Sequence, residues 1–196
     1  MAPPSIGNDI VDLQAEGSPL HPRYKERVFT RTEQERIGHN LPALWVNWAA
    51  KEAAYKMVKR HHSIMYFAPK EFEYDSLTDS VEYNSVTYPC ISSFDENHAT
   101  SICASNQEIL KSPLLHSWVT KLSSNSKSSS EEIREVAILK ISTLLKISEE
   151  NLSISPSREK GSPPILFIDG SPSTYLLSFS HHGGLLFCSC YLGGVE

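Results

Sequence analysis

The sequence predicts an α+β protein built from two similar lobes. Two stretches with helical spacing of apolar residues, 44–58 and 131–147, are each followed by several short apolar runs of strand length. Residues 121–130 contain six serines in ten positions and have the composition of a linker. We therefore expect an N-terminal lobe over residues 1–120, a linker over 121–130 and a C-terminal lobe over 131–196. The shared order of a helix and then strands favours a pseudo-dimer with its site in the cleft between the lobes.

The elements of the N-terminal half follow from local patterns. Residues 5–13 have the β-branched and apolar composition of a strand, interrupted near the middle by the acid Asp9. Thr30 and Glu33 have the spacing of a capping box and predict the start of a helix. Pro42 opens the clearest predicted helix, which continues to about Val58. Three later apolar runs predict strands: 67–74, 81–88 and 98–104.

The C-terminal half starts with the second predicted helix, over residues 131–147. Its first turns are acidic and its later turns carry lysines, which matches the helix dipole. Short apolar runs predict strands at 152–154 and 165–168. A hairpin is predicted from residues 175–180 and 185–192, around a turn of two histidines and two glycines.

Composition excludes several classes of protein. The 196 residues carry a formal net charge of −5, which argues against binding nucleic acid through overall charge. No apolar run approaches the roughly 20 residues needed to span a bilayer, and the N-terminus lacks the pattern of a signal peptide. The four cysteines have no metal-site spacing and indicate buried free thiols in a reducing compartment. We expect a cytoplasmic protein that binds neither a membrane nor nucleic acid.

Two acids from distant parts of the sequence are candidates for a common site. Asp9 lies inside an apolar strand, where burial is costly unless the charge finds a partner. Glu52 and Lys56 lie four residues apart, on one face of the predicted helix. If that face meets the strand, Asp9 and Glu52 converge and can hold Mg²⁺ beside phosphate oxygens. On spacing alone, a surface ion pair between Glu52 and Lys56 is the commoner arrangement.

Four sequence blocks, taken together, resemble a known family. Residues 7–11 read GNDIV and residues 48–56 read WAAKEAAYK, and this pair is similar to the 4'-phosphopantetheinyl transferase superfamily, in particular its holo-acyl-carrier-protein synthase branch. Residues 27–33 (RVFTRTE) and 178–182 (SFSHH) resemble two further elements in the family's order. The blocks extend over most of the chain. The resemblance implies a 4'-phosphopantetheinyl transferase-like α+β fold.

The resemblance also implies a reaction and roles for residues. Family members move the phosphopantetheine arm of coenzyme A onto a serine of a carrier protein and release adenosine 3',5'-bisphosphate. By this resemblance Asp9 and Glu52 would hold Mg²⁺, Glu52 or a metal-held water would accept the serine proton, and Lys56 would contact a phosphate oxygen or the leaving group. Ser180 and His181 would hold coenzyme A phosphates. Arg60, in the tract 59–62, would face either the adenosine 3'-phosphate or water.

The chain departs from the family pattern at three points. Val11 stands where the two-lobed branch carries a third carboxylate. Ser162 replaces the phosphate-binding lysine of a G-K-P element, so Lys160 or Arg158 is expected to supply that charge. The Ser-His element follows the metal motif here, whereas it precedes that motif in the two-lobed branch.

Three neighbouring residues keep two interpretations each. Lys51 either takes part in catalysis or pairs with a nearby acid. Asp12 either supports the site or forms the turn at the strand end. His182 is expected to matter less than His181, because the family has Ser or Thr at that position.

Partners and rival functions follow from the same residues. Arg23, Arg27 and Arg31 form a basic stretch on which an acidic carrier protein could dock, the alternative being an ordinary solvated helix face. A fused pseudo-dimer predicts a monomer, with a trimer as the alternative. The rival functions are a catalytically silent module that binds coenzyme A or a carrier protein, and a magnesium-dependent hydrolase of nucleotide diphosphates.

Overall fold

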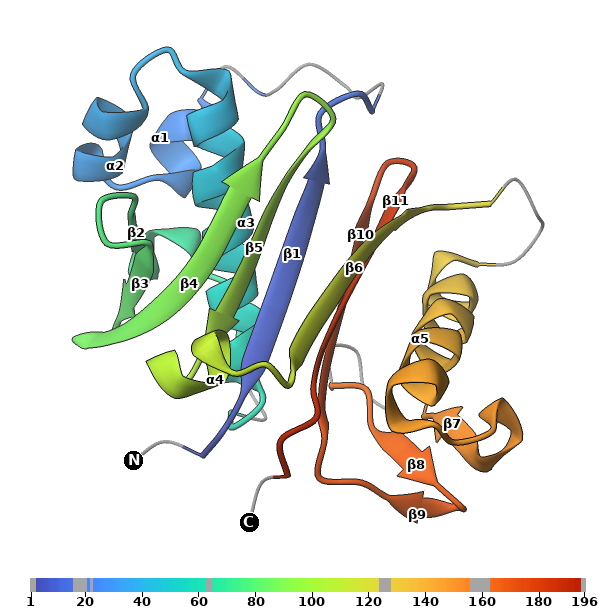
Figure 1. Cartoon of the computed structure of the whole chain (residues 1–196). Helices are drawn as coiled ribbons and strands as arrows, with labels where there is room; N and C mark the ends of the chain where they lie inside the picture. Colours follow the sequence, from blue (N-terminus) through green and yellow to red (C-terminus); the bar gives the residue numbers. More distant parts are fainter. Residues whose placement is uncertain are drawn as a thin grey trace.

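The computed structural model describes residues 3–15, 21, 23–62, 65–123, 128–155 and 163–194. Its strands form a five-stranded sheet of order β1-β5-β4-β3-β2, a three-stranded sheet of order β10-β11-β6 and a small sheet of order β7-β8-β9 (Figure 1). Each neighbouring pair of strands is antiparallel. The predicted α+β class is confirmed.

The first lobe is built on the five-stranded sheet. The strands are β1 (Ile6–Asp12), β2 (Glu73–Asp75), β3 (Ser80–Tyr83), β4 (Val86–Phe94) and β5 (His98–Ala104). The helices are α1 (Tyr24–Val28), α2 (Arg31–Ile37), α3 (Leu41–Lys59), the 3₁₀ helix η1 (Pro69–Glu71) and α4 (Gln107–Lys111). The long helix α3 covers one face of this sheet (Figure 1).

The second lobe is built on the three-stranded sheet. The strands are β6 (Leu115–Lys121), β7 (Leu152–Ile154), β8 (Leu166–Ile168), β9 (Ser171–Pro172), β10 (Leu176–His182) and β11 (Leu185–Tyr191). Helix α5 (Ser129–Leu145) is followed by the 3₁₀ helix η2 (Glu149–Asn151). The helix α5 packs against the three-stranded sheet, as α3 packs against the first one (Figure 1).

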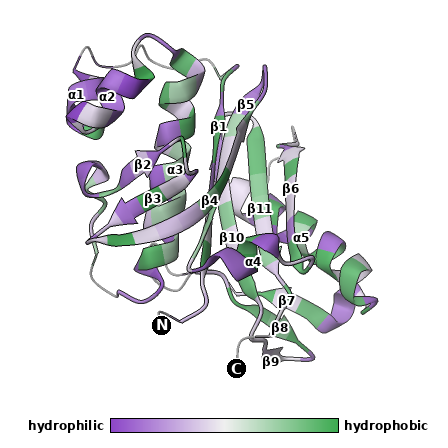
Figure 2. Ribbon diagram, turned by 60° about the vertical axis from the view of Figure 1, so that its left-hand side comes forward, coloured by the Kyte–Doolittle hydropathy of each residue, from purple (hydrophilic) through white to green (hydrophobic). Residues whose placement is uncertain are grey.

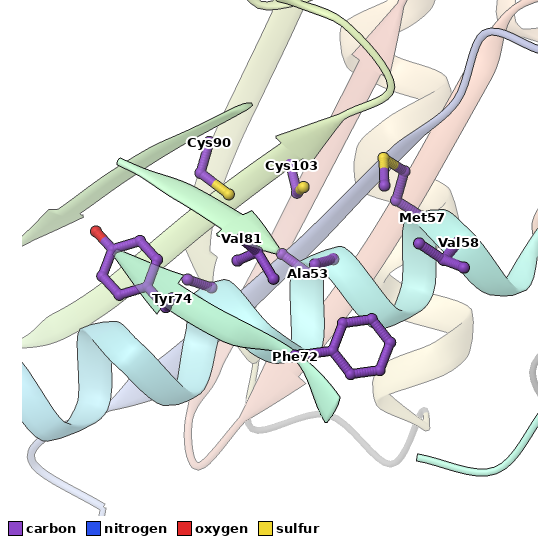
Figure 3. Close-up of a cluster of buried hydrophobic side chains, with 10 residues drawn as sticks. Ala53, Met57, Val58, Phe72, Tyr74, Val81, Cys90 and Cys103 are labelled. Atoms are coloured by element: carbon purple, nitrogen blue, oxygen red, sulfur yellow. The ribbon is translucent and has the colours of Figure 1, made fainter. Parts of the chain in front are cut away.

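Three hydrophobic cores join these layers. One lies between α3 and the first sheet and includes Ala53, Met57, Phe72 and Cys103 (Figure 3). A second lies between the two sheets, and a third between the second sheet and α5. The order of layers is therefore helix, sheet, sheet, helix, with β1 lying against β10 and β11 where the two lobes meet.

The two lobes have the same order of strand connections. In each lobe the first strand pairs with the last strand, which in turn pairs with the strand before it: β1-β5-β4 and β6-β11-β10. In each lobe the long helix comes between the first strand and the others. This is the arrangement that a pseudo-dimer requires, while its origin by duplication stays a prediction.

The lobe boundary differs from the predicted one. β6 pairs with β11, so residues 115–120 belong to the second lobe and the change of sheet occurs between α4 and β6. Serine-rich composition marks an exposed connection but does not say which strands it joins. Of the predicted linker, residues 124–127 lie outside the described residues, Ser128 caps α5, and 129–130 begin that helix.

Two predicted strands of the first lobe are also corrected. Residues 67–74 contain η1 and only the start of β2, because Pro69 has no N–H to donate to a sheet. Residues 81–88 are two strands rather than one, since Asn84 and Ser85 have φ values of 51° and 62° and form a hairpin turn. The predicted capping box of Thr30 and Glu33 is confirmed, and the four cysteines are buried free thiols.

No helix in the described part of the chain has both the length and the apolar composition needed to cross a bilayer.

Candidate active site

Helix α3 lies directly on strand β1 because of a glycine. A Cβ atom at Gly7 would lie 2.0 Å from the carbonyl oxygen of Ala53 and 2.6 Å from the amide nitrogen of Met57. Only a residue without a side chain allows this approach. The close contact brings the middle of α3, with Glu52 and Lys56, against the centre of β1, with Asp9.

Lys56 connects the helix to the strand. Its Nζ lies 2.7 Å from Oδ1 of Asp9 and donates to the carbonyl oxygen of Asn8 at 3.1 Å. The Asp9 side chain is 11% exposed and that of Lys56 is 31% exposed, so solvent reaches the pair only in part. The alternative of a plain surface pair between Glu52 and Lys56 is therefore wrong, because the ammonium group binds Asp9.

The pKa values of both carboxyl groups are raised where α3 packs on β1. Burial raises the pKa of Asp9, and the Lys56 ammonium only partly opposes it. Burial, and then the charge of Asp9, raise the pKa of Glu52 to about 7, again opposed by Lys56. The two acids thus lie close enough to repel each other. When both carboxyl groups are ionised, the single positive charge of Lys56 neutralises only one of the two negative charges.

This donor set fits a divalent cation. Carboxylate oxygens are the ligands that Mg²⁺ prefers, and Mg²⁺ usually keeps several waters and binds only one or two protein carboxylates. Among the described residues no group of three or more His, Cys, Asp or Glu side chains is arranged as a metal site. Val11, where a third carboxylate was considered, is buried in an apolar cluster with Ala49. Asp9 and Glu52 are thus the pair that would hold the metal.

The second lobe meets this site along β10. Ser178 Oγ accepts a hydrogen bond of 3.0 Å from the Asn8 backbone N–H, and the Asn8 amide donates to the Phe187 carbonyl at 3.1 Å and to Ser189 Oγ at 3.0 Å. Ser180 Oγ and Asn8 Oδ1 are buried without a hydrogen-bond partner. Buried hydroxyls normally have a partner, so Ser180 is an unsatisfied polar group on the face of β10 that meets the first lobe.

The structure brings His182 to this region. Its Nδ1 accepts a 3.0 Å hydrogen bond from the Asp12 backbone N–H, and its imidazole is among the groups that lower the pKa of Asp9 against the effect of burial. His181, the predicted ligand, alternates to the face of β10 that carries Phe179, which packs with the α5 core. Since Ser178 faces β1, the two-residue period of a strand would have indicated His182.

Arg60 has backbone partners that the sequence did not predict. Its Nε donates to the Ile6 carbonyl at 2.8 Å, and its guanidinium also donates to the Leu177 carbonyl. Burial lowers its pKa to about 10. Arg60 therefore joins β1 to β10, a role different from the predicted contact with coenzyme A. Lys160 and Arg158 lie outside the described residues.

A buried ion pair lies directly behind the site. Lys51 and Glu33 are both fully buried and pair with each other, and Lys51 Nζ lies 5.1 Å from the centre of the Phe29 ring. Glu33 also accepts hydrogen bonds of 2.8 Å from the backbone N–H groups of Thr30 and Tyr74. Of the two interpretations of Lys51, the structure supports pairing with an acid. The block at residues 27–33 thus fixes α2 against α3, next to Glu52.

Tyr24 is a site residue that the sequence did not indicate. Its ring lies 6.0 Å from that of Trp45 and 5.9 Å from that of Trp48, one helical turn before Glu52. Burial, followed by the charges of Glu52 and Asp9, raises the pKa of its phenol. The hydroxyl group therefore stays protonated beside the acids. No spacing rule could have found it, because α1 contacts α3 only through tertiary packing.

The predicted basic surface is exposed on α1 and α2. Arg23, Arg27 and Arg31 are all exposed, and the two helices are largely hydrophilic (Figure 2). Arg23 pairs with Glu26 at 3.1 Å and Arg31 with Glu35 at 3.1 Å. Because Tyr24 of α1 packs on α3, this surface lies beside the acid pair.

Comparison with known proteins bears on the first lobe. A family model described as 4'-phosphopantetheinyl transferase superfamily matches residues 5–113, more than half of the chain. A search of the curated proteins found no match. The matched residues include both acids, Lys56 and the buried pair behind them, all of which the fold gathers around β1 and α3. The chain therefore belongs to the 4'-phosphopantetheinyl transferase superfamily.

Proposed function

We propose that the protein transfers the 4'-phosphopantetheine group from coenzyme A to a serine of an apo-carrier protein, with Mg²⁺, as a holo-acyl-carrier-protein synthase does. The observation that carries this proposal is the acid pair Asp9 and Glu52, brought together and largely buried where α3 packs on β1. Family membership supports phosphopantetheine transfer in general. Coenzyme A as donor, the carrier serine and the metal are the parts that need testing.

The chemistry requires a proton acceptor and positive charge. The serine oxygen would attack the phosphorus that carries the pantetheine arm, the bond from that phosphorus to the bridging oxygen would break, and adenosine 3',5'-bisphosphate would leave. When bound by Asp9 and Glu52, Mg²⁺ supplies charge that neutralises phosphate oxygens. Glu52, or a water held by the metal, would accept the serine proton. The Lys56 ammonium is placed to contact a phosphate oxygen or the leaving group.

The second lobe would supply contacts to coenzyme A. The unpaired Ser180 hydroxyl fits such a contact, as the sequence predicted, and the placement of His182 favours it over His181. Since one chain contains both sides of the cleft, we propose a monomer. Light scattering at micromolar concentration tests this, and a trimer would contradict it.

The carrier protein would dock on α1 and α2. An acidic partner is attracted by the exposed guanidinium groups of Arg23, Arg27 and Arg31. Arg27→Glu is expected to raise the KM for the carrier, with the effect growing as salt is lowered, and to leave binding of coenzyme A unchanged. Equal carrier kinetics at low and high salt would place the carrier elsewhere.

The direct test is transfer itself. The protein is incubated with coenzyme A, Mg²⁺ and a panel of apo-carriers, and intact mass is read for the gain of one phosphopantetheine arm. Asp9→Asn and Glu52→Gln are expected to abolish the gain, while Glu149→Gln, an exposed carboxylate of the second lobe, serves as the matched control. Full transfer by either active-site variant would refute the assignment of the acids.

One alternative has a specific observation in its favour. Ser162 stands where many family members have a phosphate-binding lysine, so a silent module that binds coenzyme A or a carrier remains a second candidate. Calorimetry would then show binding without any mass gain. Release of phosphopantetheine without a carrier would instead indicate the hydrolase.

A further inference from the structure

We infer that Asp12 is a positioning residue, which fastens the β10–β11 turn to the end of β1 and presents Nε2 of His182 to a phosphate group of coenzyme A. The identity of the ligand rests on the proposed function. The fastening itself rests on contacts in the protein alone. Neither residue had this role in the sequence prediction, which favoured His181.

Asp12 binds the second lobe through both its backbone and its side chain. Its backbone N–H donates to His182 Nδ1 at 3.0 Å, and its Oδ2 accepts from the Gly184 N–H at 2.9 Å. Its Oδ1 accepts from the Gln14 N–H at 2.9 Å, which fixes the carboxylate at the strand end. Both interpretations of Asp12 are thus combined, since it forms the turn and also holds the hairpin.

The turn is shaped to receive this carboxylate. Gly183 has φ +55°, and a Cβ atom there would lie 2.4 Å from Asp12 Oδ2 and 2.7 Å from Ala15 Cβ. A side chain at this position would be strained and would displace Asp12. The hairpin therefore contacts the end of β1 directly, and His182 bonds across the lobe junction to Asp12.

The hydrogen bond at Nδ1 of His182 determines which ring nitrogen of the neutral imidazole carries the proton. Because Nδ1 accepts an N–H, the neutral imidazole must carry its proton on Nε2, an assignment inferred from the bonding partner. No described residue is seen to bond Nε2. Nε2 therefore remains as a donor near the acid pair, where a charge-assisted bond to phosphate is stronger than a neutral one.

Two substitutions of His182 distinguish the contribution of Nε2 from that of Nδ1. His182→Asn puts an amide oxygen near the place of Nδ1 and leaves nothing at Nε2, whereas His182→Gln puts an amide nitrogen near Nε2 and loses the bond to Asp12. We expect His182→Asn to weaken coenzyme A binding about tenfold to a hundredfold with little change in Tm. His182→Gln should lower Tm and keep more of the affinity. His181→Asn, on the other face of the same strand, is the comparison.

A double-mutant cycle tests whether Asp12 acts through His182. Asp12→Ala alone is expected to lower Tm and to raise the Kd for coenzyme A several-fold. Combined with His182→Asn, Asp12→Ala should add little further loss of affinity, because the group it positions is already absent. Calorimetry with coenzyme A and thermal unfolding without it give the two readouts.

The outcomes distinguish this inference from the proposed function. Loss of affinity in His181→Asn but not in His182→Asn would overturn the assignment of the donor. Independent, additive effects of Asp12→Ala and His182→Asn on Kd would overturn the positioning role. If the unchanged protein does not bind coenzyme A, the proposed function and the ligand assignment fail. The fastening is then judged by Tm alone, in a cycle of Asp12→Ala with His182→Gln, the variant that loses the bond to Asp12. Coupling of their effects on Tm upholds the fastening, and additivity refutes it.

Discussion

Removing the charge of Glu52 is expected to stabilise the protein while it abolishes transfer. The folded protein raises the pKa of this carboxyl from 4.5 to about 7, chiefly by burial and then by the charge of Asp9. The folded state therefore binds a proton that the unfolded state releases. Its contribution to stability is fully present below pH 4.5 and is lost as the pH rises through 7.

The magnitude follows from the two pKa values. A rise from 4.5 to about 7 corresponds to an upper limit of about 3 kcal/mol at pH 8. Because Glu52 is half-buried and water screens part of the repulsion, we expect about 1–2 kcal/mol. For a chain of this size that is a rise in Tm of about 2–8 °C for Glu52→Gln at pH 8. At pH 5, where the folded carboxyl is protonated, the gain should be much smaller.

The assay is thermal unfolding of both proteins between pH 5 and 8, without metal and again with Mg²⁺. The advantage of Glu52→Gln should grow up to about pH 7 and then level off. Mg²⁺ should raise the Tm of the unchanged protein more than that of the variant, since the bound metal offsets the repulsion. A gain that is independent of pH, or an equal response to Mg²⁺, would refute the account of this site.

Three further predictions concern the framework around the acids. Lys51→Met should cost about 3–5 kcal/mol in urea unfolding by leaving the Glu33 charge buried, and adding Glu33→Leu should recover part of it; an unchanged midpoint would refute the buried pair. Thr30→Ala should cost about 1 kcal/mol through loss of the cap, and a variant as stable as the original would contradict the capping role. Arg60→Met should lower Tm by exposing unpaired carbonyls and leave the Kd for coenzyme A within about twofold; the opposite pattern would restore its predicted role as a ligand.

Local patterns predicted the parts of the site that lie on single elements. An acid in a strand and a Glu-Lys pair on a helix made Asp9 and Glu52 candidates, but spacing alone favoured a surface ion pair, and the family resemblance brought the two acids together. The Thr30 capping box was predicted because all of its partners lie within four residues. Only the capping box therefore needed no knowledge of the tertiary packing.

The contacts that the sequence did not predict join elements that lie far apart in the chain. The Lys51–Glu33 pair joins two helices, and a buried ion pair leaves the same sequence pattern as two exposed charges. Residues 115–120 were assigned to the first lobe and no strand was predicted there, because the pairing of β6 with β11 spans the whole second lobe. His182 is a different case, because side chains alternate between the two faces of β10 and this period places His182 on the same face as Ser178.

The edge of β1 explains why the site and the lobe junction coincide. β1 is the last strand of its sheet, so every second residue presents backbone groups that need partners. Side chains supply them: Arg60 to Ile6, Lys56 and Ser178 to Asn8, and His182 to Asp12. Lys56 lies in α3, Arg60 caps the end of α3, and the other two side chains come from β10, so neither lobe completes the edge alone. None of the contacts depends on the connection between α4 and β6, so the same junction can form whichever lobe comes first in the chain. The position of the Ser-His element after the metal motif is therefore compatible with the same cleft.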